Sequence, residues 1–224
     1  MTGPQGPQGL QGLKGDKGDP GTVDLASIKT IKFGTDEVNF SQFESDGTLV
    51  LYGEATVWED LRFPATAINP AGAVTAMTFD TTNLGFAAMN SSSTQSIAII
   101  AQMPHSWKVG SEIHPHIHWE PKSTDTGSVL WRLEYKWANI NGNEPTDWTT
   151  LDVLDPGDGT AFKHQMVSFA NISGTGKTIS SILSIKISRV AGDATDTYNG
   201  EALLKEFDIH FEIDTLGPRT PGSK

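Results

Sequence analysis

The stretch Gly110-Ser-Glu-Ile-His-Pro-His-Ile-His-Trp-Glu-Pro121, together with Val129-Leu-Trp-Arg-Leu-Glu-Tyr-Lys-Trp137, decides the class of fold. In both stretches apolar side chains alternate with polar ones. Because successive side chains of a β-strand point to opposite faces, each stretch predicts a strand with one face in an apolar core. We expect residues 121–128 to form the turn that joins the two strands as a hairpin.

Further segments with the composition of strands end at Gly, Pro, Asp, Asn or Ser residues. They are 48–58, 73–79, 96–103, 148–154, 161–169, 183–187 and 206–213. Most of the six Trp residues occupy alternating strand positions and are expected in the core. This series of short strands predicts an all-β fold, an antiparallel jelly-roll-like sandwich, for a head of residues 45–217. A neck or linker of residues 22–44 precedes the head, and a tail of residues 218–224 follows it.

A different repeat fills the N-terminal part of the chain. Three polyproline II chains can wind round one another only where every third residue lacks a side chain at the crowded axis. Residues 1–21 meet this condition and predict a short collagen-like triple helix, so the chain is expected to be a homotrimer. Because six triplets are too few to hold three chains together alone, we expect the head to trimerise as well. The glycines of the repeat are Gly3, Gly6, Gly9, Gly12, Gly15, Gly18 and Gly21.

Charge and composition narrow the range of partners. The formal net charge is −11, and the 16 Lys and Arg residues are scattered along the chain. Phosphate backbones are bound by clustered Lys and Arg, so no nucleic-acid partner is expected. The chain has no Cys, which excludes disulfides and thiolate ligands. The sequence also shows no signal peptide and no apolar run long enough for a transmembrane segment, so membrane insertion is not expected.

A collagen-like stretch that leads into a compact β head resembles the trimers of complement and tumour-necrosis-factor type. In a chain without Cys or a signal peptide, the glycine triplets resemble more closely the collagen-repeat fibre and capsid-decoration proteins of tailed bacteriophages. That resemblance implies a structural protein on the surface of the virion. Its partners would be its own copies, other virion proteins and a glycan or protein of the host surface. A trimeric glycan- or protein-binding module of complement type is the alternative.

The most unusual residues of the head lie on the expected strand 112–120, where polar residues alternate with apolar ones and share one face. Neutral imidazoles beside carboxylates are ligands for a divalent transition metal such as Fe, Zn or Ni. In one interpretation three copies surround one ion on a trimer axis, similar to the His-X-His metal sites of some phage fibre tips. In another, the side chains form a polar strand face without a metal. The candidate metal ligands are Glu112, His114, His116, His118 and Glu120.

A metal-dependent enzyme of cupin type is a further alternative. Five residues of this region follow one another with spacings similar to much of the first cupin motif. They are Gly110, His116, His118, Glu120 and Gly127. The carboxylate follows the second His sooner than in that family, and no matching second motif follows. Without a convincing catalytic set, the chain is predicted not to be an enzyme. His210, on the polar face of the expected strand 206–213, is either a neighbour of these His residues or a solvated residue, as a lone His on a strand more often is.

Overall fold

The computed structural model describes Gly3 and residues 31–34, 37–68, 76–88 and 92–218. The predicted collagen-like stalk lies outside the described residues, with all its glycines except Gly3. Residues 22–30 of the predicted neck, 73–75 of a predicted strand and 219–224 of the tail also lie outside them.

The described part of the chain is all-β. All pairings between its strands are antiparallel. It includes no helix with the length and hydropathy that a membrane crossing requires. The strands are β1 (Ile31–Gly34), β2 (Phe40–Phe43), β3 (Leu49–Tyr52), β4 (Val57–Pro64), β5 (Thr78–Asp80), β6 (Gly85–Ala88), β7 (Gln95–Gln102), β8 (Ile113–Pro121), β9 (Ser128–Ala138), β10 (Thr149–Pro156), β11 (Gln165–Ser168), β12 (Ile182–Arg189) and β13 (Ala202–Ile213).

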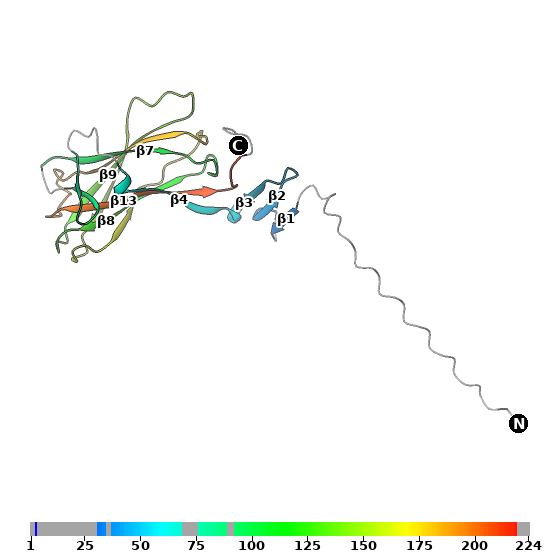
Figure 1. The fold of residues 1–224 in the computed structure, drawn as a ribbon, viewed down its shortest axis with the longest axis horizontal. Coiled ribbons are helices and arrows are strands. Elements are labelled where there is room, and N and C mark those ends of the chain that lie inside the picture. Colours follow the sequence, from blue (N-terminus) through cyan, green and yellow to red (C-terminus); the bar gives the residue numbers. More distant parts are fainter. Residues whose placement is uncertain (1–2, 4–30, 35–36, 69–75, 89–91, 219–224) are drawn as a thin grey trace.

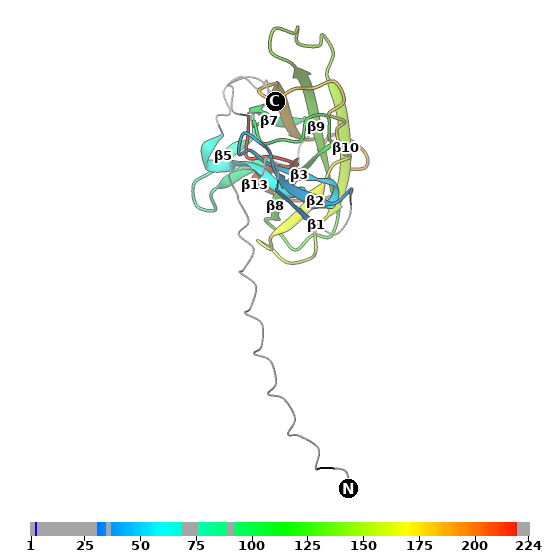
Figure 2. The same ribbon diagram turned by 90° about the vertical axis from the view of Figure 1, so that its right-hand side faces the viewer.

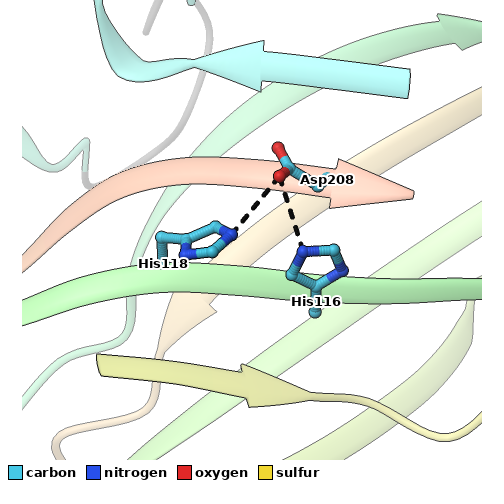
Figure 3. Close-up of side chains that lie close together, drawn as sticks. All are labelled: His116, His118 and Asp208. Carbon is cyan, nitrogen blue, oxygen red and sulfur yellow. Dashed lines mark ion pairs between the residues drawn. The ribbon is translucent and has the colours of Figure 1, made fainter. Parts of the chain in front are cut away.

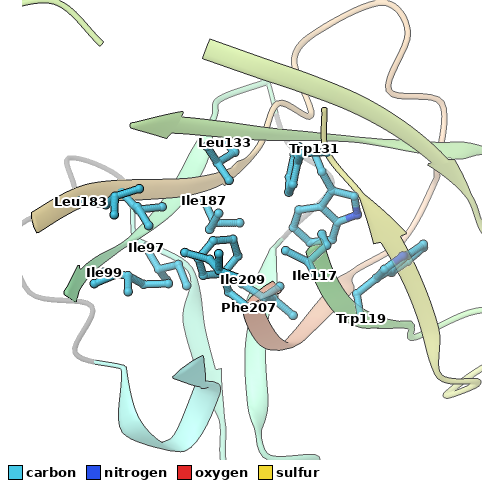
Figure 4. Packing of buried hydrophobic residues seen from close by; sticks show 14 of the residues in the cluster. Ile97, Ile99, Ile117, Trp119, Trp131, Leu133, Leu183, Ile187, Phe207 and Ile209 are labelled. Atoms are coloured by element: carbon cyan, nitrogen blue, oxygen red, sulfur yellow. The ribbon is translucent and has the colours of Figure 1, made fainter. Parts of the chain in front are cut away.

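Two sheets form a β-sandwich (Figure 1, Figure 2). One sheet has the strand order β10-β9-β12-β7, and the other has the order β11-β8-β13-β6-β5, with β4 also paired to β13. Figure 4 shows the core, in which Leu133 and Ile187 of the first sheet belong to one cluster with Ile117, Phe207 and Ile209 of the second. The predicted all-β, sandwich-type head is therefore confirmed.

The alternation in the two deciding stretches is confirmed as well. Ile113, Ile117 and Trp119 of β8 have no exposed surface, and neither have Trp131 and Leu133 of β9. The polar residues between them are less buried, as expected for the opposite face of each strand. His116 is the exception, because it is buried although it lies on the polar face. The Trp side chains that lie in the core, as predicted for most of them, are Trp107, Trp119, Trp131 and Trp137.

The predicted hairpin of these two strands is wrong. β8 pairs with β11 and β13, whereas β9 pairs with β10 and β12 in the other sheet. Residues 122–127 carry the chain across from one sheet to the other. Trp119 and Trp131 consequently contact each other across the core, with ring centroids 5.9 Å apart. Alternation determines which face of a strand is buried, but it contains no information on the neighbouring strand.

Three other segments differ from the sequence-based expectation. Residues 48–58 form two strands, because a 3-10 turn at Gly53–Ala55 starts at a glycine with φ +58° and separates β3 from β4. Within 161–169 only β11 is a strand. Strand β6 was not predicted, since all four of its residues are buried and its sequence shows no alternation.

Strands β1, β2 and β3 form a separate three-stranded sheet at one end of the molecule (Figure 1). Two of these strands, β1 and β2, fall within residues 22–44, the predicted neck. The backbone N–H of Leu51 donates to the carbonyl of Asp214 (2.7 Å), which ties this sheet to the chain just after β13.

Candidate functional site

The polar face of the sheet that contains β8 and β13 carries an unusual concentration of imidazole and carboxylate groups. The two strands pair with His116 opposite Asp208 and with His114 opposite His210. Directly opposed residues of an antiparallel pair project to the same face. The register therefore brings the His residues of β8 together with acidic and His residues that lie about ninety positions later in the chain.

At the centre of this face, His116 and His118 converge on one carboxylate. The Nε2 atoms of both rings lie 3.4 Å from the same Oδ2 atom of Asp208. Figure 3 shows the two imidazoles reaching from β8 toward Asp208 on β13. The side chains of His116 and Asp208 are buried, and that of His118 is 21% exposed. One potential ligand atom from each of the three residues lies within 4.8 Å of the others.

The two imidazoles have opposite pKa shifts. Burial disfavours the charged form of His116, but contact with the Asp208 carboxylate and its negative charge outweigh burial and raise the pKa of His116. Burial lowers the pKa of His118, and the neighbouring His116 and His164 act in the same direction against the charge of Asp208. His118 thus favours the neutral form, in which an imidazole can act as a metal ligand.

Neighbouring rings hold the two imidazoles in place. Nδ1 of His118 lies 2.7 Å from Nε2 of His164, and the two rings are stacked with centroids 4.9 Å apart. The His116 ring packs against the His210 ring at a centroid distance of 4.3 Å. Nε2 of His210 is 2.8 Å from Oδ1 of Asp60 on β4. Of the two alternatives for His210, the structure shows the neighbour of the His residues of β8, with a side chain that is still 41% exposed.

An open hollow of about 530 Å³ lies over this part of the sheet. His118, His164 and Asp208 contribute to its lining, and further charged side chains come from β4 and β13. Arg62 on β4 forms a bidentate pair with the carboxylate of Glu206, at 2.9 Å for each contact. The carboxylate of Asp208 lies between the imidazoles of β8 and Arg62, the residue opposite it on β4, and the negative charge of Asp208 contributes to the raised pKa of Arg62.

The five predicted metal ligands do not all lie together in the structure. His116 and His118 lie together, whereas His114 packs against Trp58, with ring centroids 4.6 Å apart. Oε2 of Glu112 accepts a hydrogen bond from Nδ2 of Asn171 (3.1 Å). Oε2 of Glu120 lies 3.6 Å from Nζ of Lys205.

Asp208 and His164 belong to the site but were not among the predicted ligands. Asp208 occupies the polar face of an alternating strand that was predicted, next to His210, which was singled out. The missing information was the register between β8 and β13, which no local pattern supplies. His164 lies just before β11, the strand that pairs with β8 on its other side.

No protein-family model matches this chain, and no curated protein sequence matches it. Similar solved structures include an isomalto-dextranase of Arthrobacter globiformis T6 complexed with panose, with 16% identity, a TM-score of 0.40, and coverage of 67% of this chain and 23% of that one. A structure of infectious bursal disease virus, Gx strain, has 11% identity, a TM-score of 0.41, and coverage of 85% and 38%.

The xylan-binding domain CBM22-1 of Paenibacillus barcinonensis Xyn10C has 12% identity, a TM-score of 0.29, and coverage of 70% of this chain and 86% of that one. The chain thus spans less than half of the isomalto-dextranase and of the viral protein. At TM-scores below 0.5, these likenesses carry no inference about what the chain binds.

Proposed function

We propose that this protein is a homotrimeric structural protein of a bacteriophage particle surface, either a fibre or a capsid decoration. The observation that carries the proposal is the unbroken glycine period from Gly3 to Gly21. A three-chain rope is the structure that requires glycine at every third position, because a larger side chain does not fit at its axis. The jelly-roll-like sandwich forms the head of each chain.

The sheet of β1–β3 supports the trimer independently of the glycines. The register places Phe33, Ser41 and Leu51 side by side, and likewise Phe43 and Leu49, so that these five side chains share one face without a charge. Phe33 and Phe43 are 58% and 43% exposed. None of the side chains described in β1–β3 is fully buried. A small sheet needs a covered apolar face for stability, and the described residues of one chain leave Phe33 and Phe43 on this face exposed.

In the proposed trimer, the other copies of the chain bury this apolar face. The sheet begins ten residues after the last glycine of the predicted stalk, at Ile31. Chains that wind together up to residue 21 therefore bring three such sheets close to one axis. Burial of a Phe side chain stabilises by about 1.5–3 kcal/mol. Two Phe per chain thus make a substantial contribution to a three-chain interface.

The role on the particle follows from the resemblance of the triplets to the collagen-repeat proteins of tailed bacteriophages. Immunoelectron microscopy of purified particles of the phage that encodes this chain, with an antibody against the head, tests it. Label on the tail supports a fibre, and label on the capsid shell supports a decoration protein. Particles that carry no label, while the antibody detects the purified protein, contradict the proposal.

A further inference from the structure

The geometry points to a metal site within each chain: His116, His118 and Asp208 bind one divalent transition-metal ion of the Zn(II) or Fe(II) type. The sequence predicted ligands along β8 alone. The proposed set instead combines two residues of β8 with one carboxylate of β13. It does not depend on the oligomeric state, because all three ligands come from one chain. It goes beyond the proposed structural role of the protein.

The distances suit a metal better than direct hydrogen bonds. The two contacts between the imidazole Nε2 atoms and Oδ2 of Asp208 measure 3.4 Å each. A hydrogen bond from a ring nitrogen to a carboxylate is shorter, about 2.7–2.9 Å. In a tetrahedral site with bonds of about 2.0–2.2 Å, neighbouring ligand atoms lie roughly 3.4 Å apart. Both nitrogen-to-oxygen distances therefore match those of a tetrahedral site, and the three ligand atoms lie within 4.8 Å of one another.

The second oxygen of Asp208 provides independent support. Oδ1 of this carboxylate is buried and has no hydrogen-bond partner within the described part of the chain, and the residue is only 4% exposed. Leaving a buried carboxylate oxygen without a partner is costly, because the water that it loses is not replaced. A bound cation adds to the positive charge of Arg62, the residue opposite Asp208 on β4, in compensating this cost, whether Oδ1 joins as a ligand or not.

His164 supplies the outer contact that ligating imidazoles usually have. Its Nε2 lies 2.7 Å from Nδ1 of His118. When Nδ1 of His118 donates to His164, the lone pair of His118 is on Nε2, the atom that faces Asp208. Outer contacts of this kind fix both the tautomer and the orientation of a ligating ring.

The donor set indicates the class of ion. Two imidazole nitrogens and one carboxylate favour Zn(II), Fe(II) or Ni(II), whereas Mg(II) and Ca(II) prefer sites made of oxygen atoms. Three protein ligands leave at least one coordination position free. The open hollow next to His118 and Asp208 gives water access to that position.

Metal analysis and Zn(II) titration of the full chain test this site. After treatment with a chelator, isothermal titration calorimetry with Zn(II) is expected to show one ion per chain, and substitution by Co(II) is expected to give the visible absorption of a four- or five-coordinate ion. We expect His118→Ala and Asp208→Asn to weaken Zn(II) binding by more than about 100-fold, since even loss of an outer contact costs about 10- to 100-fold. His164→Gln is expected to weaken it by about 10-fold.

His114→Gln is the matched control, because His114 lies on the same strand and the same face but contacts Trp58. It is expected to bind Zn(II) like the unmodified chain. If Asp208→Asn fails to fold, Zn(II) binding by His118→Ala still tests the proposal, because His118 is the more exposed ligand. Absence of binding, unchanged binding by a folded His118→Ala variant, or one ion per three chains would each overturn the proposal. None of these results would alter the oligomeric state on which the proposed function rests.

Discussion

The sandwich and the three-stranded sheet β1–β3 both contain large aromatic side chains, which are buried in the sandwich and exposed in the small sheet. In the sandwich, Trp119, Trp131 and Phe207 have no exposed surface. In β1–β3, Phe33 and Phe43 remain largely exposed, and none of the described side chains is fully buried. The sandwich therefore completes its core within one chain, whereas the described residues of one chain leave the apolar face of the small sheet exposed. In the proposed trimer, this difference identifies β1–β3 as the place where the chains meet, next to the predicted stalk.

The largest effect is expected in the core of the sandwich. Trp131→Ala should lower the free energy of unfolding by about 3–5 kcal/mol, because it removes a large buried side chain and leaves a cavity. Chemical denaturation followed by circular dichroism measures the loss. Trp148→Ala is the matched control, since Trp148 is 37% exposed and its removal should cost far less. Equal losses for both variants would contradict a core completed within one chain.

The second effect concerns assembly rather than folding. Phe33→Asp combined with Phe43→Asp places charges on the apolar face of β1–β3, where the proposed trimer buries them, and should shift the protein toward single chains. Light scattering after size-exclusion chromatography measures the mass, and near-ultraviolet circular dichroism should show intact Trp packing in the sandwich. Ile100→Asp, at a position 64% exposed on β7, is the control and should leave the mass unchanged. A double variant that keeps the mass of the unmodified protein would show that this face is no interface.

Much of the sandwich could be predicted from the sequence, because each half-buried strand has its own periodicity. The alternation on 112–120 and 129–137 correctly assigned the buried faces. The pairing of those strands was predicted wrongly, since a strand pattern says nothing about its neighbour. The same limit explains why His116 and His118 were predicted as candidate metal ligands while Asp208 was not. Their meeting depends on the register between strands far apart in the chain.

The smallest effect is a pH dependence at Asp155. Burial raises the pKa of this carboxyl above its ordinary value of 3.8, although Nε1 of Trp119 donates a hydrogen bond to it (2.6 Å). A raised pKa means that this carboxyl stabilises the fold at pH values below 3.8 and loses that contribution as the pH rises through its raised value. The melting temperature of Asp155→Asn, relative to that of the unmodified protein, should therefore be higher at pH 7 than near pH 4. Thermal melts at the two pH values check this, and the opposite trend would contradict the assigned direction.

The mass of the native full chain tests the central claim most directly. Native mass spectrometry should find three times the 24.1 kDa of the single chain. A Gly12→Val variant, which puts a side chain at the axis of the rope, should melt at a lower temperature than the unmodified trimer. A native mass of one chain, with no thermal effect of the valine, would contradict the account.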